Sequence, residues 1–245
     1  MRKTCTITGV NGFIGNALNI KLQSLGWKTY PTMRPDVDYV FLFGSPSSDH
    51  WFHYALGYSL QETIGNFISA AEYCRENNIK LIYPSSGTIY EGTTPYAKCK
   101  RILDIITTMY GEHILGLRIF AGYGIGEAHK REYASIIYKF AKAMKRGERP
   151  VIWGDGTQTR DFIYIDDIIN AIIKYKDVEG FLDVGTGIST SFNTIVKIIN
   201  EKLGTHIEPL YKEKPDFYVE HTICTKSSEH TVSVEEGIQR ILDSL

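Results

Sequence analysis

The chain has 245 residues and a formal net charge of −1, which is long enough to bury a full core as one large domain or as two compact lobes. Hydrophobic residues make up 43% and charged residues 22% of the chain, a balance typical of a folded globular protein and not of a disordered one. The near-neutral charge excludes a broadly basic surface, so we expect no nucleic-acid partner.

The ends and the cysteines narrow the class further. The N-terminus runs into a strand-like segment that breaks at Gly9, too short for a secretory apolar region, and no stretch approaches the ~20 apolar residues of a membrane span. The four cysteines form no C-x-x-C pair, and His50 and His53 have no further ligand cluster nearby, so we predict no metal site and no disulfide framework. A cytoplasmic protein without a membrane partner is expected.

Strands and helices alternate through the first half of the chain. A β-rich alternating segment at 4–8 precedes a glycine cluster and a helical pattern at 17–25, and a short strand is expected at 27–32. The following strands are predicted at 38–43, 79–83 and 114–120, with helices at 60–77 and 96–110. Such alternation predicts an α/β fold with a doubly wound, Rossmann-like parallel sheet, whose ligands bind at the carboxyl ends of the strands.

The regular alternation of strands and helices ends after Phe120. A glycine-rich loop at 121–126, a basic helix at 133–146 and a turn-rich stretch at 147–160 predict a second, smaller lobe. A helix at 163–175 and a strand at 180–184 then return the chain to the main sheet. We therefore predict a dinucleotide-binding domain over 1–122 plus about 162–203, and a lobe over about 123–161 plus 204–245.

The first turn carries a dinucleotide-binding pattern. Gly9, Gly12 and Gly15, with Phe13 and Ile14 between them, follow the first strand and open the first helix. Gly9 permits the tight turn, Gly12 lets the backbone approach a pyrophosphate, and Gly15 allows close packing of helix and strand. Gly44, after the third strand, is expected at the same edge and is also predicted to bind the cofactor.

The choice between NAD and NADP depends on the end of the second strand. The position that often carries a carboxylate for the adenosine ribose is occupied by Arg34, a residue suited to a 2′-phosphate. Arg34 as a solvated loop charge, with Asp36 or Asp38 at the ribose, is the alternative. The sequence slightly favours NADP.

Three residues have the chemistry of an acid–base group. Ser86 lies just after the strand predicted at 79–83, at the carboxyl edge of the sheet. Tyr96 and Lys100, four residues apart, share one face of the following helix. A phenol with a pKa of about 10 is a poor base at neutral pH, but a neighbouring ammonium and a positive nicotinamide favour the phenolate. Ser86 would then bond the substrate oxygen as charge shifts.

These blocks resemble the extended short-chain dehydrogenase/reductases, specifically the NAD-dependent nucleotide-sugar epimerase/dehydratase family. The matching pieces are GVNGFIG, SSGTIY, YAKCK, LRIFAGYG, GDGTQTRDF and IYIDD. The resemblance implies that Tyr96 is the catalytic acid/base and that Lys100 lowers its pKa and holds the nicotinamide ribose. It also implies that Ser86 and Tyr96 contact the sugar and that Arg160 binds the nucleotide diphosphate. The smaller lobe would then bind the substrate, and the protein would form a homodimer. An ion pair from Arg160 to Asp161 or Asp166 is the alternative.

The chain also departs from the family pattern. Tyr96 follows Ser86 by only ten positions, a shortened connection, and Ala121 stands where an Asn is common. Gly87 and Thr88 occupy the places of the Asp–Glu pair of the dehydratases. The sequence thus predicts an NAD(P)-dependent nucleotide-sugar epimerase acting at carbon 4, with an NADPH-dependent ketoreductase and a non-catalytic dinucleotide-binding protein as alternatives.

Overall fold

The computed structural model describes residues 3–90, 92–215 and 218–245, and the chain divides into two compact units. The first contains Met1–Ile119 and Ile169–Asp183, and the second contains Phe120–Ile168 and Val184–Leu245. The chain therefore passes between the units more than once, and each unit is built from two separate segments.

A six-stranded sheet with the order β2-β1-β3-β4-β5-β9 forms the centre of the first unit. Its strands are β1 (Thr4–Thr8), β2 (Lys28–Tyr30), β3 (Tyr39–Leu42), β4 (Lys80–Ser86), β5 (Ile114–Ile119) and β9 (Gly180–Val184). The pairs of β1 with β2 and β3, of β3 with β4 and of β4 with β5 are parallel. The predicted Rossmann-like sheet is confirmed, and the strand order reverses between β1 and β3, where such folds bind ligands.

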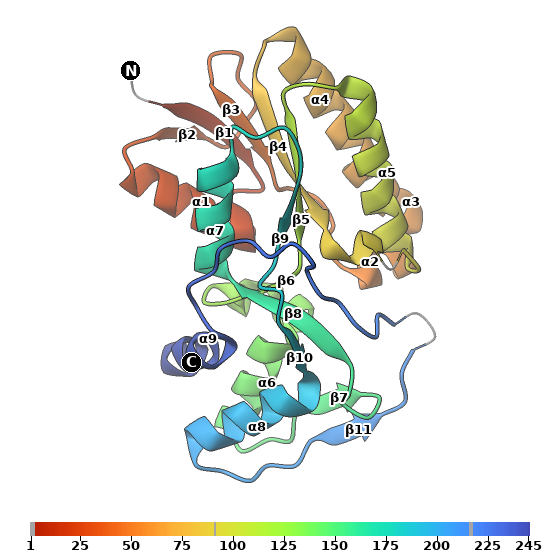
Figure 1. Cartoon of the computed structure of the whole chain (residues 1–245), viewed down its shortest axis with the longest axis vertical. Helices are drawn as coiled ribbons and strands as arrows, with labels where there is room; N and C mark the ends of the chain where they lie inside the picture. The colour runs from red at the N-terminus through yellow and green to blue at the C-terminus, as the bar shows by residue number, and fades with distance from the viewer. Residues whose placement is uncertain (1–2, 91, 216–217) are drawn as a thin grey trace. The chain divides into compact units, whose positions relative to one another are not determined.

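Helices cover both faces of this sheet. They are α1 (Phe13–Ser24), α2 (Asp49–Tyr54), α3 (Leu56–Leu60), the π-helical η1 (Gln61–Gly65), α4 (Asn66–Glu76), the 3₁₀ turn η2 (Gly87–Tyr90), α5 (Pro95–Tyr110) and α7 (Ile165–Tyr175). Figure 1 shows α1 and α7 on one side of the sheet and α4 and α5 on the other. The core between α4, α5 and the strands is aliphatic and aromatic, with Leu81, Phe67 and Leu103 fully buried.

Local signals explain why α5 begins and ends where it does. The Thr94 hydroxyl accepts a hydrogen bond of 3.2 Å from the backbone N–H of Ala97, and Pro95 occupies the first helical position, both favourable at a helix start. Gly111, with φ of 77°, follows the last turn, a conformation that favours glycine. The helix that carries Tyr96 and Lys100 is thus fixed at both ends.

The second unit contains two small sheets and three longer helices. β10 (Ser189–Ser191), β8 (Thr159–Tyr164) and β6 (Ala121–Tyr123) form one sheet, and β11 (Leu210–Lys212) pairs with β7 (Val151–Trp153) in the other. η3 (Glu127–Tyr133), α6 (Ile136–Lys145), α8 (Phe192–Leu203) and α9 (Val234–Ser244) complete it. α6, α8 and α9 pack against one another.

The structure corrects several predicted elements. Residues 163 and 164 end β8 and do not begin a helix, because Phe162 to Tyr164 pair with β6; the helix starts at Ile165. The single helix predicted at 60–77 is divided into α3, η1 and α4. α8, predicted within the dinucleotide-binding domain, belongs to the second unit, where it packs on α6. The binding roles predicted for the two parts stay predictions.

Across the described ranges, no helix combines the length and apolarity needed to cross a bilayer.

Candidate dinucleotide site and catalytic group

The glycine turn lies between β1 and α1 with almost no room for side chains. The backbone N–H of Gly12 donates to the carbonyl of Gly9 at 2.8 Å, and Gly9 has φ of 66°. A Cβ on Gly9 would lie 2.7 Å from the backbone of Gly44, and one on Gly15 would overlap the carbonyl oxygen of Gly9. The sheet edge therefore brings the predicted cofactor residues Gly9, Gly12, Gly15 and Gly44 together.

The start of α1 is suited to an anion. Gly12 is the N-cap residue and offers no side chain to the first turn, which contains no acidic residue. The first N–H groups of a helix lack intrahelical partners and carry partial positive charge. Phe13 and Ile14 form this first turn and are half-buried, so their backbone groups are the ones that a pyrophosphate would meet.

Several buried hydroxyls of the first unit have no partner in the part of the chain that the structure describes. Within the described residues, the hydroxyls of Thr8, Ser48, Thr63 and Ser85 are buried and have no hydrogen-bond partner. Thr8 ends β1, Ser48 precedes α2 after β3, and Ser85 lies near the end of β4. Because buried polar groups in native proteins are nearly always bonded, unmet hydroxyls at this edge fit a polar ligand such as a dinucleotide.

A small pocket joins this edge to the predicted catalytic lysine. Gly44 and Ser45 after β3, Pro84 of β4 and Lys100 of α5 line it. All of these residues belong to the first unit. The predicted cofactor residues Gly44 and Lys100 thus share one cavity.

Ser86 and Tyr96 also meet. Burial raises the pKa of the Tyr96 phenol above its ordinary value, as do the charges of Asp49 and Cys99, whereas the Ser86 hydroxyl lowers it. Ser86 is 2.9 Å from the Thr88 hydroxyl and accepts from the Thr88 N–H at 3.2 Å. In the protein alone, Tyr96 is therefore a protonated phenol close to Ser86.

Lys100 is fully buried beneath this pair. Its Nζ donates to the carbonyl of Pro84 at 2.8 Å and lies 5.7 Å from the centre of the Tyr96 ring. Burial lowers the pKa of Lys100 to about 8, opposed by Cys99 and Asp104, so the ammonium keeps its charge at neutral pH. The structure places Lys100 beside the ring, but the phenol pKa in the protein alone is raised, contrary to the sequence-based expectation.

A polar ladder fixes α5 against β4. Tyr96 meets Ser86, Lys100 meets Pro84, and one turn further on the Asp104 carboxylate accepts from the Tyr83 hydroxyl at 2.9 Å. The Arg118 Nε donates to Asp104 at 2.9 Å. Side chains spaced four residues apart on α5 thus contact the last residues of β4, and these contacts set the position of Tyr96 and Lys100.

Arg118 extends this ladder to the shortened connection between Ser86 and Tyr96. Its guanidinium donates to the Tyr90 hydroxyl at 3.0 Å and lies 3.8 Å from Asp183. The Tyr90 hydroxyl donates to Asp183 at 2.7 Å. The η2 turn is thus tied to β5 and β9 by side chains that the sequence pattern did not single out.

Arg34 lies apart from the lysine pocket. It forms a two-point ion pair with Asp36, at 2.8 and 3.0 Å, and its guanidinium carbon lies 4.4 Å from the Tyr30 ring centre. A 2′-phosphate would have to compete with that carboxylate. Asp38, the alternative ribose ligand, instead accepts from the backbone and hydroxyl of Thr4 at the opposite, amino end of β1.

Arg160 belongs to the second unit, on β8. Its guanidinium donates to the carbonyls of Thr159 and Glu220, at 2.7 and 3.1 Å, and to that of Val219 at 2.5 Å. The carboxylate of Asp161 accepts from backbone N–H groups of Thr186, Gly187 and Cys224, and that of Asp166 accepts from Arg240. Backbone carbonyls therefore hold the Arg160 guanidinium, and its diphosphate role stays a prediction.

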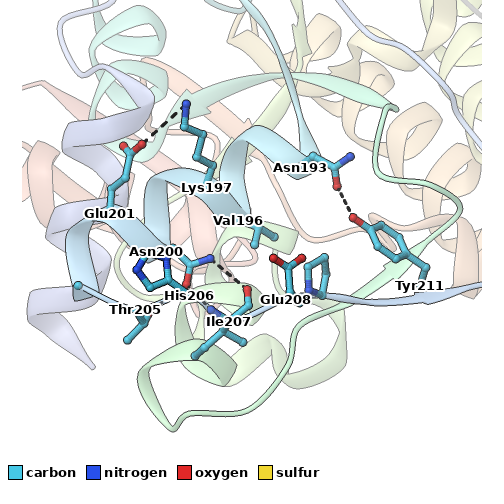
Figure 2. A pocket seen from close by; sticks show the side chains of 12 residues that line it. Asn193, Val196, Lys197, Asn200, Glu201, Thr205, His206, Ile207, Glu208 and Tyr211 are labelled. Atoms are coloured by element: carbon cyan, nitrogen blue, oxygen red, sulfur yellow. Dashed lines mark hydrogen bonds and ion pairs between the residues drawn. The ribbon is translucent and has the colours of Figure 1, made fainter.

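The second unit also has two larger hollows. One, of about 630 Å³, is bordered by α8 and the segment after it; Figure 2 shows Tyr211 bonded to Asn193 and Asn200 bonded to the backbone of Ile207 along its wall. The other, of about 550 Å³, is rich in hydroxyls, among them Ser189, Thr190 and Ser233. Arg160 lines neither of them. In the part of the chain that the structure describes, no group of three or more His, Cys, Asp or Glu side chains is placed to hold a metal ion.

The fold and the glycine turn define a Rossmann-type α/β protein, and comparison with known proteins gives its family. The sequence pattern of the NAD dependent epimerase/dehydratase family matches residues 32–178, more than half of the chain. The chain belongs to this family of enzymes. The family is NAD-dependent, so the predicted preference for NADP finds no support.

Individual relatives are more distant. A provisionally named UDP-glucose 4-epimerase of Methanocaldococcus jannaschii is 28% identical over 204 residues, which cover 72% of this chain and 66% of that protein. The ADP-L-glycero-D-manno-heptose-6-epimerase of Brachyspira hyodysenteriae is 28% identical over 183 residues, or 61% of this chain and 58% of that protein. The alignments thus span less than two-thirds of either relative.

A solved structure matches the whole chain. The UDP-N-acetylglucosamine 4-epimerase from Methanobrevibacter ruminantium M1, in complex with UDP-N-acetylmuramic acid, has a TM-score of 0.88 at 23% identity and covers 100% of this chain and 99% of its own. Identity this low shows a shared fold, and the substrate of this chain does not follow from it.

Phe52 and Thr63 are among the residues at the candidate site that sequence reasoning missed. The Phe52 ring, which lies between His50 and His53 in the sequence, packs edge-on against Tyr96 with the ring centres 5.4 Å apart. Thr63 carries one of the partnerless hydroxyls, and nothing in its helical sequence context distinguishes it.

Proposed function

We propose that this chain is an NAD-dependent nucleotide-sugar epimerase that acts at carbon 4. The observation that carries the proposal is the group formed by Ser86, Tyr96 and Lys100 at the same sheet edge as the glycine turn. When bound, NAD supplies a carbon that accepts a hydride and gives it back. Such a cycle inverts a carbinol centre without net consumption of cofactor.

Each residue has a separate task. Tyr96 would take the proton of the sugar hydroxyl, and Ser86 would donate its single hydroxyl hydrogen to the same sugar oxygen. Lys100, charged at neutral pH, would hold ribose hydroxyls and favour the phenolate. Since burial raises the pKa of Tyr96 in the protein alone, the positive nicotinamide would supply the remaining stabilisation of the phenolate.

Water elimination is a poor fit to these residues. Gly87 and Thr88 stand where dehydratases of the family carry an acidic pair, and the Thr88 hydroxyl is engaged by Ser86. A ketoreductase that uses NADPH is the second candidate, because Arg34 follows the second strand; its ion pair with Asp36 weakens that case. A dinucleotide-binding protein without turnover is the third.

The direct test is product analysis. Purified protein with NAD is incubated with UDP-glucose, UDP-N-acetylglucosamine and other nucleotide sugars, and the products are identified by NMR. We expect a 4-epimer without accumulation of NADH. Steady consumption of NADPH with a keto-sugar would show the ketoreductase, and an unchanged panel with bound cofactor would leave only the binding protein.

Tyr96→Phe supplies the matched variant. We expect loss of turnover by about 10³-fold or more, as for removal of an acid–base group, with NAD affinity nearly unchanged. Tyr58→Phe, at a tyrosine that is 57% exposed, is the control and should leave both unchanged. Equal turnover in Tyr96→Phe and the wild type would overturn the catalytic role.

We further propose a homodimer formed through the first unit. Ile102, Ile105 and Met109 lie along an exposed stripe of α5, and Ile68 of α4 is also exposed. An apolar stripe of this kind on adjacent helices fits a second copy of the same surface. Light scattering of the wild type and of Ile105→Glu tests it: we expect a dimer and a monomer, respectively.

A further inference from the structure

Thr88 lies in the 3₁₀ turn that follows β4 and contacts the Ser86 hydroxyl twice. The Thr88 backbone N–H donates to the Ser86 Oγ at 3.2 Å, and the hydroxyl oxygens of the two residues are hydrogen-bonded at 2.9 Å. Ser86 itself is 5% exposed. A serine hydroxyl has one hydrogen and two lone pairs, so Thr88 alone takes up most of the bonding capacity of Ser86.

The direction of the bond between the two hydroxyls decides what Ser86 offers to a ligand. The Thr88 N–H occupies one lone pair of the Ser86 Oγ. If the Thr88 hydroxyl donates as well, both lone pairs are filled and the Ser86 hydrogen is left for a ligand. If Ser86 donates to Thr88 instead, its hydrogen is used and it offers only a lone pair.

The surroundings favour Thr88 as the donor. Among the residues that the structure describes, the Thr88 hydroxyl has Ser86 as its hydrogen-bond partner and no other, so its hydrogen has no competing acceptor there. The Ser86 hydroxyl lies close to the Tyr96 phenol and lowers the pKa of that group, which is the effect of a hydrogen-bond donor. The hydrogen bonds thus form one chain from Thr88 through Ser86 toward Tyr96.

The proposed reaction requires the same direction. The sugar oxygen loses its hydrogen to Tyr96 and from then on can only accept hydrogen bonds. Partial negative charge on such an oxygen is stabilised by donors that are aimed at it beforehand. A Ser86 hydroxyl that donated to Thr88 would have to turn over in every catalytic cycle. With both lone pairs occupied, Ser86 is already a donor, and a donor in a chain of hydrogen bonds is strengthened by the one before it.

We infer that Thr88 is a positioning residue, whose hydroxyl and backbone N–H together fix Ser86 as a hydrogen-bond donor to the reacting sugar oxygen. This inference rests on the proposed function, because it requires turnover of a sugar. Thr88 acts through Ser86 and needs no contact with the sugar. The alternative is that Thr88 only shapes the 3₁₀ turn, a task that its backbone N–H performs without the hydroxyl.

The experiment compares Thr88→Val, which keeps the branched shape and the N–H but removes the hydroxyl, with Thr88→Ser, which keeps the hydroxyl. Both are made in the wild type and in Ser86→Ala. Thr108→Val, at an exposed threonine of α5, is the control. Rates of the full chain with NAD are measured with UDP-glucose or UDP-N-acetylglucosamine, whichever the wild type converts faster, to obtain kcat and KM. Calorimetry gives the affinity for NAD.

We expect Thr88→Val to lower kcat by about 3- to 10-fold, the range for one hydrogen bond. KM and NAD affinity should stay within about twofold, because the bond acts on the reacting oxygen and not on ground-state binding. Thr88→Ser should recover most of the lost kcat, and Thr108→Val should match the wild type. Ser86→Ala should lower kcat by about 10²-fold or more. In that background Thr88→Val should change kcat by less than about twofold, because the hydroxyl that Thr88 orients is gone.

Three results would overturn the inference and leave the proposed epimerase intact. They are an unchanged kcat in Thr88→Val, the same loss with and without the Ser86 hydroxyl, and a change in KM or NAD affinity alone. A wild type that converts no nucleotide sugar would overturn the inference and the proposed function together. If Thr88→Val fails to fold, Thr88→Ala and Thr88→Ser are compared in the same two backgrounds, and equal kcat values in them count against the inference.

Discussion

Asp104→Asn is expected to be one of the most damaging conservative changes in the first unit. The Asp104 side chain is 8% exposed and accepts charge-assisted bonds from the Arg118 Nε and the Tyr83 hydroxyl, both at 2.9 Å. The amide keeps the shape but removes the charge and adds two donors, which leaves Arg118 with only Asp183 at 3.8 Å as a described anionic partner. Breaking a buried pair costs about 3–5 kcal/mol, and the 22% exposure of Arg118 favours the lower end, about 3 kcal/mol.

Glu72→Gln is the matched control, because Glu72 also accepts from a tyrosine and an arginine. Its partners are Tyr110, at 2.8 Å, and Arg75, but the side chains of Glu72 and Arg75 are 41% and 63% exposed. Exposed pairs contribute about 0–1 kcal/mol. The assay is thermal and urea unfolding, with a melting temperature about 6–12 °C lower for Asp104→Asn and almost unchanged for Glu72→Gln. Similar small losses in both variants would refute the claim that burial makes the α5 ladder stabilising.

Two more predictions concern the glycine turn and the lysine. Gly15→Ala should abolish NAD binding and lower stability, because its Cβ would overlap the Gly9 carbonyl. The control is Gly57→Ala, which has open space around it and should bind NAD as the wild type does. Calorimetry and melting curves compare the two variants, and normal NAD binding by Gly15→Ala would contradict the role of the turn. Burial lowers the pKa of Lys100 to about 8 from about 10.4 in the unfolded chain. Above pH 8 the unfolded state therefore binds more protons at Lys100 than the folded state does, and the destabilisation caused by the buried ammonium shrinks as pH rises. The wild type should therefore gain about 2 kcal/mol relative to Lys100→Met between about pH 8 and pH 9.5 in urea unfolding, and a difference independent of pH would show that Lys100 is not desolvated in the folded chain.

The sequence predicted the parts of the fold that depend on local pattern. The strand expected at 4–8 and that expected at 180–184 have the observed bounds, because β-rich residues there are bounded by glycine. The helix expected at 163–175 was partly wrong, since the apolar run at 162–165 fits a buried strand as well as a helix and the pairing of β8 with β6 and β10 decides between them.

The same difference between local pattern and tertiary contact applies to the candidate site. The chain-order motif was sufficient to predict that Ser86, Tyr96 and Lys100 would meet, but not that burial would raise the pKa of Tyr96. The contacts of Phe52 with Tyr96, of Asp104 with Arg118, and the missing partner of Thr63 are tertiary facts. They depend on which helix lies over which strand, and spacing along the chain carries no information about that.

The division of the chain between its two units has a consequence for biosynthesis. The first unit is interrupted after Ile119 and resumes at Ile169, so its last strand, β9, leaves the ribosome only after some fifty residues of the second unit. Until then the edge of β5 is open and Arg118 lacks Asp183, which β9 carries. The nascent five-stranded sheet is thus an exposed template for pairing with another chain, and a chaperone requirement should concentrate in the interval before residue 183 emerges from the ribosome.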